Sequence, residues 1–137
     1  MTASSGLIAG VADVARIEQV PLTQHRLPAS TYELLRQAAT VLSGSFRGED
    51  VIARIGGDEF VVILVHIDAE GLFSSAEKLR TLVGQSAFFE NNEQIHVTVS
   101  IGATLVQDTD TTETMMQRAD ALMYRSKKTG CNKVSID

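Results

Sequence analysis

The chain has 137 residues, of which 44% are hydrophobic, and it carries a formal net charge of −5. This length and composition indicate one soluble globular domain and exclude a disordered chain. The acidic charge argues against broad nucleic-acid binding, which needs a basic face. No apolar run approaches about 18 residues, so we expect no contact with a membrane. The single cysteine, Cys131, excludes an internal disulfide and suits a reducing compartment, so we expect a cytoplasmic protein.

The N-terminal part of the sequence predicts a strand over residues 6–14, with Asp13 near its C-terminal end. A carboxylate in this position is often only a solvated strand end, and the local sequence leaves that alternative open. Residues 15–20 fit a short helix. Pro21 and Pro28 then interrupt any regular element.

The first clear helix is predicted over residues 30–42. Ser30-Thr31-Tyr32-Glu33 fits a capping box, and the apolar residues that follow recur every three or four positions. Gly44 is a suitable end for this helix.

Two apolar segments, 51–53 and 61–65, flank a turn in which residues 54–60 read RIGGDEF. Strand-forming runs on either side of a glycine-containing turn predict a β-hairpin. The continuous apolar run 61–65 predicts a buried central strand. The adjacent carboxylates Asp58 and Glu59 could hold a hard cation such as Mg²⁺, although solvated acids at a glycine turn remain the simpler alternative.

A second helix is predicted over residues 69–83, capped by Asp68 and ended by Gly84. Residues 95–101 alternate apolar and polar side chains, which predicts a strand with one packed face. His96 falls on the more polar face of that strand, where a surface histidine is more common than a ligand.

A third helix is predicted after a second capping box at residues 110–113. Its last turn holds Lys127 and Lys128, which oppose the helix dipole or bind a ligand. Gly130 ends the helix, and residues 133–136 predict a last short strand. The buried stripe of the helix is predicted to comprise Met115, Met116, Ala119, Leu122 and Met123.

The order of these elements contains the β-α-β-β-α-β pattern of a ferredoxin-like α+β fold. In that fold the first strand lies beside the hairpin, so Asp13 approaches Asp58 and Glu59. Three carboxylates around one point repel one another unless a cation neutralises them, which favours a divalent metal site.

Four segments resemble the GGDEF domain family in order and spacing: residues 48–54, the signature at 54–60, and residues 97–102 and 118–127. The resemblance covers about residues 30–135 and implies an α+β nucleotidyl-cyclase palm, in which a mostly antiparallel sheet is flanked by helices and a hairpin carries the signature turn.

Typical members of this family join two GTP molecules into cyclic di-GMP and release pyrophosphate, with Mg²⁺ or Mn²⁺, in a homodimer whose two active sites face each other. The resemblance implies that Gly56 and Gly57 let the backbone pass close to the phosphates. It also implies that Asp58 and Glu59 bind metal and help to activate the attacking 3′-hydroxyl, with Asp13 as a further metal ligand.

The resemblance gives roles to four further residues. Lys127 would contact the terminal phosphates and compensate the charge that develops on pyrophosphate. Arg47 and Asp50 match an Arg-x-x-Asp motif at the spacing of the family's inhibitory product site, where Lys78 would add a second basic contact.

The sequence departs from the family on the N-terminal side of the resemblance. Asp13 is kept, but Ala15 replaces a second aspartate and Glu18 replaces a lysine. The asparagine that reads guanine in the family falls near Pro21 and is missing. The segment that usually leads into the first strand is either missing or was cut away. Cys131 stands where a phosphate-binding arginine is common.

Two functions follow as hypotheses. The first is a diguanylate cyclase, in which the signature turn, Asp13 and Lys127 perform the reaction. The second is a catalytically silent domain that binds cyclic di-GMP or GTP and regulates an attached domain. In either case we expect residues 1–137 to form a single domain within a longer signalling protein, joined to a sensor or a phosphodiesterase domain.

Overall fold

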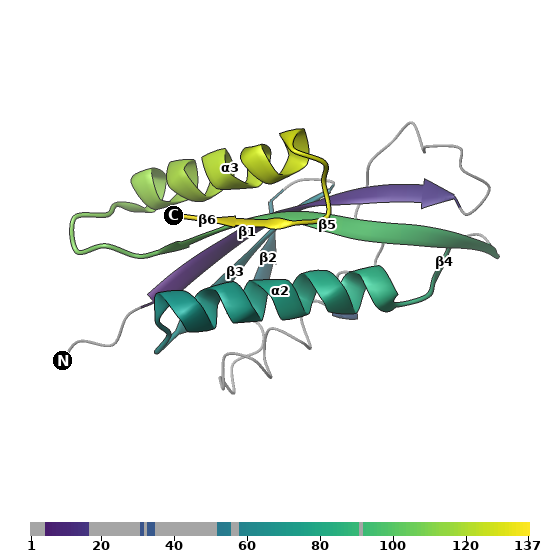
Figure 1. Ribbon diagram of the computed structural model, residues 1–137, viewed down its shortest axis with the longest axis horizontal. Helices are drawn as coiled ribbons and strands as arrows, with labels where there is room; N and C mark the ends of the chain where they lie inside the picture. Colours follow the sequence, from purple (N-terminus) through teal and green to yellow (C-terminus); the bar gives the residue numbers. More distant parts are fainter. Residues whose placement is uncertain (1–4, 17–30, 32, 35–51, 56–57, 91) are drawn as a thin grey trace.

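The computed structural model describes residues 5–16, 31, 33–34, 52–55, 58–90 and 92–137. In these residues a single sheet separates two long helices, which lie on opposite faces (Figure 1). The predicted helix at 30–42 falls mostly outside them, although Thr31, Glu33 and Leu34 are helical. Within the described part of the chain, neither long helix has the length and apolar character needed to cross a membrane.

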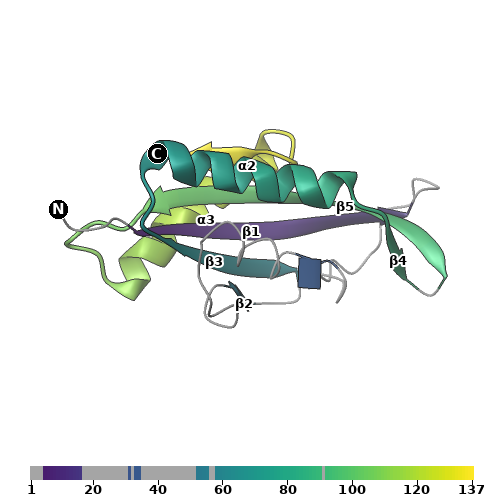
Figure 2. The same ribbon diagram turned by 90° about the horizontal axis from the view of Figure 1, so that it is seen from below.

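The sheet is mostly antiparallel, in the order β2-β3-β1-β5-β4, and β6 pairs with β5 in parallel. Figure 2 shows β2 and β3 beside β1, on the side away from β5. This arrangement confirms the predicted α+β palm, with the hairpin next to the first strand. The strands are β1 (Ser5–Arg16), β2 (Ile52–Arg54), β3 (Glu59–Val65), β4 (Phe88–Glu90), β5 (Glu93–Leu105) and β6 (Val134–Ile136), and the two helices are α2 (Ala69–Gln85) and α3 (Thr112–Lys128).

Strand β1 is longer than predicted. Ala15 and Arg16 continue it, paired with His96 and Ile95 of β5, so a helix beginning at residue 15 is wrong. The long β5 offers a partner for every residue from Gly6 to Arg16, and ladder hydrogen bonds to it keep this part of β1 extended. Residues 17–20 lie outside the described part of the chain.

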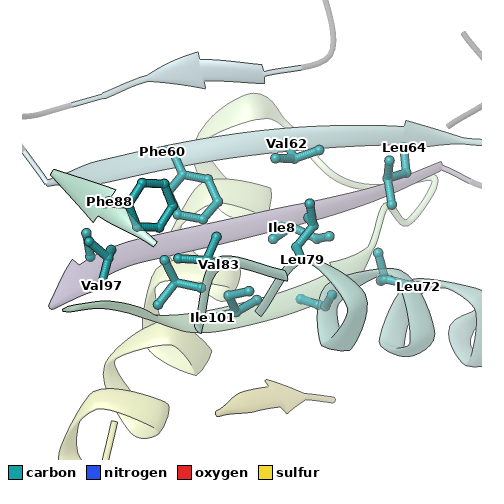
Figure 3. Close-up of a cluster of buried hydrophobic side chains, with 14 of the residues drawn as sticks. Ile8, Phe60, Val62, Leu64, Leu72, Leu79, Val83, Phe88, Val97 and Ile101 are labelled. Carbon is teal, nitrogen blue, oxygen red and sulfur yellow. The ribbon is translucent and has the colours of Figure 1, made fainter. Parts of the chain in front are cut away.

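The larger part of the core lies between the sheet and α2 (Figure 3). Alternate residues of β3 and β5 point to this face, and the apolar stripe of α2 packs on them. The side chains labelled in Figure 3 are Ile8, Phe60, Val62, Leu64, Leu72, Leu79, Val83, Phe88, Val97 and Ile101, all of which are buried.

The start of α2 follows the prediction. Asp68 is its N-cap, and its side chain accepts a hydrogen bond of 2.7 Å from the backbone N–H of Gly71. The helix ends at Gln85, two residues later than predicted.

The cap of α3 differs from the prediction. Thr111 is the N-cap, and Thr114 completes the capping box in place of Asp110 and Glu113. Asp110 instead bonds to Arg118, eight residues further on (2.6 Å). The buried stripe is confirmed at Ala119, Leu122 and Met123, with Met115 and Met116 half-buried.

Two strand predictions are also corrected. Strand β3 is not buried on both faces, because Ile63 and Val65 are 44% and 42% exposed while their neighbours Val62 and Leu64 are buried. Between α2 and residue 95, where no helix or strand was predicted from the sequence, the structure contains β4 and a turn at Asn92, whose φ is 65°.

Candidate active site

The signature turn lies against β1. The backbone N–H of Ala12 donates to the carbonyl oxygen of Asp58 (2.8 Å), and Val11 pairs with Glu59. The backbone N–H of Ile55 donates to the carbonyl of Glu59 (3.0 Å), which closes the hairpin. The backbone therefore brings the end of the turn next to the part of β1 that carries Asp13. Gly56 and Gly57 lie outside the described residues.

Asp13 and Glu59 lie on the same face of the sheet. Leu7, Ala9 and Val11 pack beneath α3, so alternation along β1 brings Asp13 to that face. The same alternation along β3, where Val61 packs beneath α3, places Glu59 there too. Both carboxylates are half-buried. The chain therefore presents two acids from neighbouring strands beside α3.

Helix α3 approaches the sheet closely at Gly102 of β5. A Cβ atom at this position would lie 2.2 Å from the backbone nitrogen of Met123 and 2.3 Å from the carbonyl oxygen of Ala119. Both distances are far below van der Waals contact, so only glycine allows this depth of packing. This close contact sets the height of α3 above Asp13 and Glu59.

The two flanks of α3 have different partners. Successive helical residues turn by about 100°, so Asp120 and Lys127 point in nearly the same direction. Both residues interact electrostatically with Glu59, which identifies this flank as the one that faces the turn. The side chain of Arg118 projects from the opposite flank of the helix. Its guanidinium donates to Asp110 and to the hydroxyl of Thr104 (2.7 Å) and ties α3 to the end of β5.

The electrostatic environment of Glu59 is negative. Burial raises the pKa of its carboxyl group above the ordinary value, and the charges of Asp120 and Asp58 raise it further, while Lys127 acts in the opposite direction. A site with this excess of negative charge attracts a cation, or a ligand that brings one.

The donor set fits a hard cation completed by a ligand. Across the described residues, no group of three or more His, Cys, Asp or Glu side chains is close enough to hold a metal ion. Mg²⁺ commonly binds through one or two carboxylates and takes its remaining ligands from substrate phosphates and water. Asp13 and Glu59, with Asp58 in the turn, supply oxygen ligands of this type.

Of the three residues of the predicted product site, the structure describes Lys78 alone. Lys78 is exposed on α2, on the opposite side of the sheet from Asp13 and Glu59. Arg47 and Asp50 lie outside the described residues, so their role stays a prediction.

Asp120 is the residue that the sequence prediction missed at this site. The available signal was its spacing, since it precedes Lys127 by seven residues, or about two helical turns. Cys131 offers no positive charge to the site. Its thiol donates to the carbonyl oxygen of Lys127 (3.4 Å), and its φ of 61° folds the chain back after α3.

Known proteins resemble this chain in sequence and in fold. Residues 29–133 match the family model described as "Diguanylate cyclase, GGDEF domain". Diguanylate cyclase A of Treponema denticola is 32% identical over 104 residues, which cover 75% of this chain and 28% of that protein. The response regulator PleD of Caulobacter vibrioides is 36% identical over 105 residues, which cover 74% of this chain and 23% of that protein.

Among solved structures, the diguanylate cyclase SiaD of Pseudomonas aeruginosa, in complex with its activator SiaC, has a similar fold. The match has a TM-score of 0.74 and 24% identity, and it covers 98% of this chain and 50% of that one. The chain spans about a quarter of the length of the two relatives named above. The matched family model covers most of the sequence, including the turn, β5 and α3, and the chain therefore belongs to the GGDEF family of diguanylate cyclase domains.

Proposed function

We propose that this chain is a diguanylate cyclase domain, which condenses two GTP molecules into cyclic di-GMP. The observation that supports the proposal is that Asp13 and Glu59 face the same side of the sheet beside the signature turn, where Lys127 of α3 acts electrostatically on Glu59. Carboxylates next to a lysine suit a metal-bound polyphosphate, because the cations offset the charge of both the acids and the phosphates.

In the proposed reaction, the 3′-oxygen of one GTP attacks the α-phosphorus of the other. A new P–O bond forms to the 3′-oxygen, the bond to the β-phosphate oxygen breaks, and pyrophosphate leaves with that electron pair. A second, equivalent step closes the ring. Glu59 or Asp58 accepts the proton of the 3′-hydroxyl, and Lys127 stabilises the negative charge that develops on the leaving pyrophosphate.

One or two carboxylates at a time from Asp13, Asp58 and Glu59 would hold Mg²⁺, or Mn²⁺, together with substrate phosphates, and the metal would supply Lewis-acid stabilisation of the transferring phosphoryl group. Gly56 and Gly57 would let the backbone pass close to the phosphates. Two copies of the chain would each bring one GTP, so we expect catalysis in a homodimer. We expect a cytoplasmic location, within a longer protein that carries a sensor or a phosphodiesterase domain.

The test is to incubate the full chain with GTP and Mg²⁺ at high protein concentration and to measure cyclic di-GMP and pyrophosphate by chromatography. The wild type should form both products, whereas Glu59→Gln and Lys127→Met should form at least 100-fold less. Glu113→Gln makes the same chemical change in the first turn of α3, away from the turn, and should keep the wild-type rate. Equal rates in wild type and Glu59→Gln would contradict the proposal.

A silent binding domain is the second candidate. This function is favoured by the differences from the family pattern near the end of β1, where Ala15 continues the strand in place of a second acid. If this function is correct, the chain binds cyclic di-GMP without making it, and Arg47→Ala abolishes that binding in calorimetry. Equal affinity for cyclic di-GMP in wild type and Arg47→Ala would refute the assignment of Arg47 to a product site.

A further inference from the structure

The outer surface of α3 carries an aromatic side chain that neither the core nor the roles assigned above account for. Tyr124 is 57% exposed, and the ammonium group of Lys128 lies over its ring, 5.0 Å from the centroid. A lysine at this distance from an aromatic face is attracted by the ring quadrupole. The ring therefore restricts a side chain that would otherwise sample many rotamers at a helix end.

The ring lies at the edge of the flank that faces Glu59. At about 100° per residue, Tyr124 projects about 40° further round the helix than Asp120 and about 60° further than Lys127. Asp120 and Lys127 are the two residues of α3 that interact with Glu59. The pair of Tyr124 and Lys128 thus continues the site outward from Lys127, over the last turn of the helix.

The last turn of α3 is an unfavourable place for a phosphate unless several cations are present. The carbonyl groups at a helix C-terminus carry partial negative charge, which repels anions. The turn contains three basic residues, Arg125, Lys127 and Lys128. At about 100° per residue, Lys128 projects about 100° from Lys127 and Arg125 about 160° from it. The ring of Tyr124 lies between the directions of the two lysines and draws the ammonium group of Lys128 toward Lys127.

We propose that Tyr124 is a positioning residue, which holds Lys128 beside Lys127 so that both ammonium groups bind the terminal phosphates of a nucleotide at the Asp13–Glu59 site. This inference rests on the proposed function and adds a second phosphate contact to it. A lysine that is already restricted loses less conformational entropy when it binds a ligand, so the ring increases affinity without touching the phosphates.

The test uses two probes, Mg²⁺ with pyrophosphate and GMP, and measures their affinities for the full chain by calorimetry. Tyr124→Ala should weaken pyrophosphate binding about two- to fivefold, the effect of losing one exposed cation–π contact. Tyr124→Phe keeps the ring and should retain the wild-type affinity. Lys128→Met should weaken binding at least as much as Tyr124→Ala, and the double variant should be no weaker than Lys128→Met alone. GMP, which lacks the terminal phosphates, should bind all of these variants equally.

Arg125→Met is the matched control, because it removes the same charge from the same helical turn on the other flank. Pyrophosphate affinity that is unchanged in Tyr124→Ala, or reduced equally in Arg125→Met and Lys128→Met, would overturn the inference. Failure of the proposed function has a different signature. A wild type that binds pyrophosphate through Lys128 and Tyr124 but forms no cyclic di-GMP would support this inference and refute the cyclase.

Discussion

Gly102 fixes the position of α3 above the site, so Gly102→Ala tests how the fold supports the chemistry. The added Cβ would lie 2.2 Å from the backbone nitrogen of Met123, whereas ordinary contact begins at 3.4 Å. The obstructing atoms belong to the helix backbone and cannot rotate away as the end of a side chain can. Helix α3 must therefore withdraw from β5 by about 1 Å, or the strand must bend.

Two consequences follow from this displacement. Overpacking of this kind costs about 3 kcal/mol, which lowers Tm by about 10 °C for a chain of this size. Lys127 moves away from Glu59 together with the helix. Because a misplacement of about 1 Å can reduce a catalytic rate about 100-fold, we expect a loss of product formation even at temperatures at which the variant stays folded.

Thermal unfolding followed by circular dichroism measures the first effect, and cyclic di-GMP formation at 20 °C below Tm measures the second. Gly84→Ala is the matched control, because a Cβ atom there meets nothing within 4 Å. It should stabilise α2 by about 1 kcal/mol and leave the rate unchanged. If Gly102→Ala proves as stable and as active as Gly84→Ala, the close contact between α3 and β5 does not control the site.

Three further predictions concern stability. Hydrogen bonds from Arg118 hold the pKa of Asp110 below its ordinary value. The pair therefore stabilises the fold above about pH 4 and loses this effect as the pH falls below that value. Asp110→Asn should reduce Tm at pH 7 and remove this acid dependence. Burial and the charges of Asp120 and Asp58 raise the pKa of Glu59. Ionisation of Glu59 therefore opposes folding as the pH rises above about 4. Without metal, Glu59→Gln should raise Tm at pH 7 and leave Tm unchanged at pH 3. Thr111→Ala removes the N-cap of α3 and should cost about 1 kcal/mol in urea denaturation.

The contact between β1 and the signature turn could be predicted from the sequence, because it follows from the order of the helices and strands. A β-α-β-β-α-β pattern places the hairpin beside the first strand, and the pairing of Val11 with Glu59 confirms this. Similarly, Asp68 caps α2 as predicted, since its partner, the N–H of Gly71, lies only three residues away.

The missed features depend on contacts between distant parts of the chain. Asp110 was a plausible N-cap, but Arg118 binds its carboxylate, and Thr111 caps the helix instead. The spacing of Asp120 from Lys127 put both residues on one flank of α3, but the structure was needed to show that this flank faces Glu59. Ile63 lies in an apolar run that predicts a buried strand, but it is exposed because α3 does not cover this part of the sheet.

In the proposed function, a metal-bound polyphosphate lies between the signature turn and the C-terminal end of α3. The most direct measurement is paramagnetic broadening in ¹⁵N spectra of the full chain with Mg²⁺ and pyrophosphate, as Mn²⁺ replaces a small fraction of the Mg²⁺. The amide signals of Ala12 and Glu59 should broaden first. Those of Gln107 and Asp110, beyond the other end of a helix about 25 Å long, should broaden last. Broadening centred on α2, or equal at both ends of α3, would contradict the account.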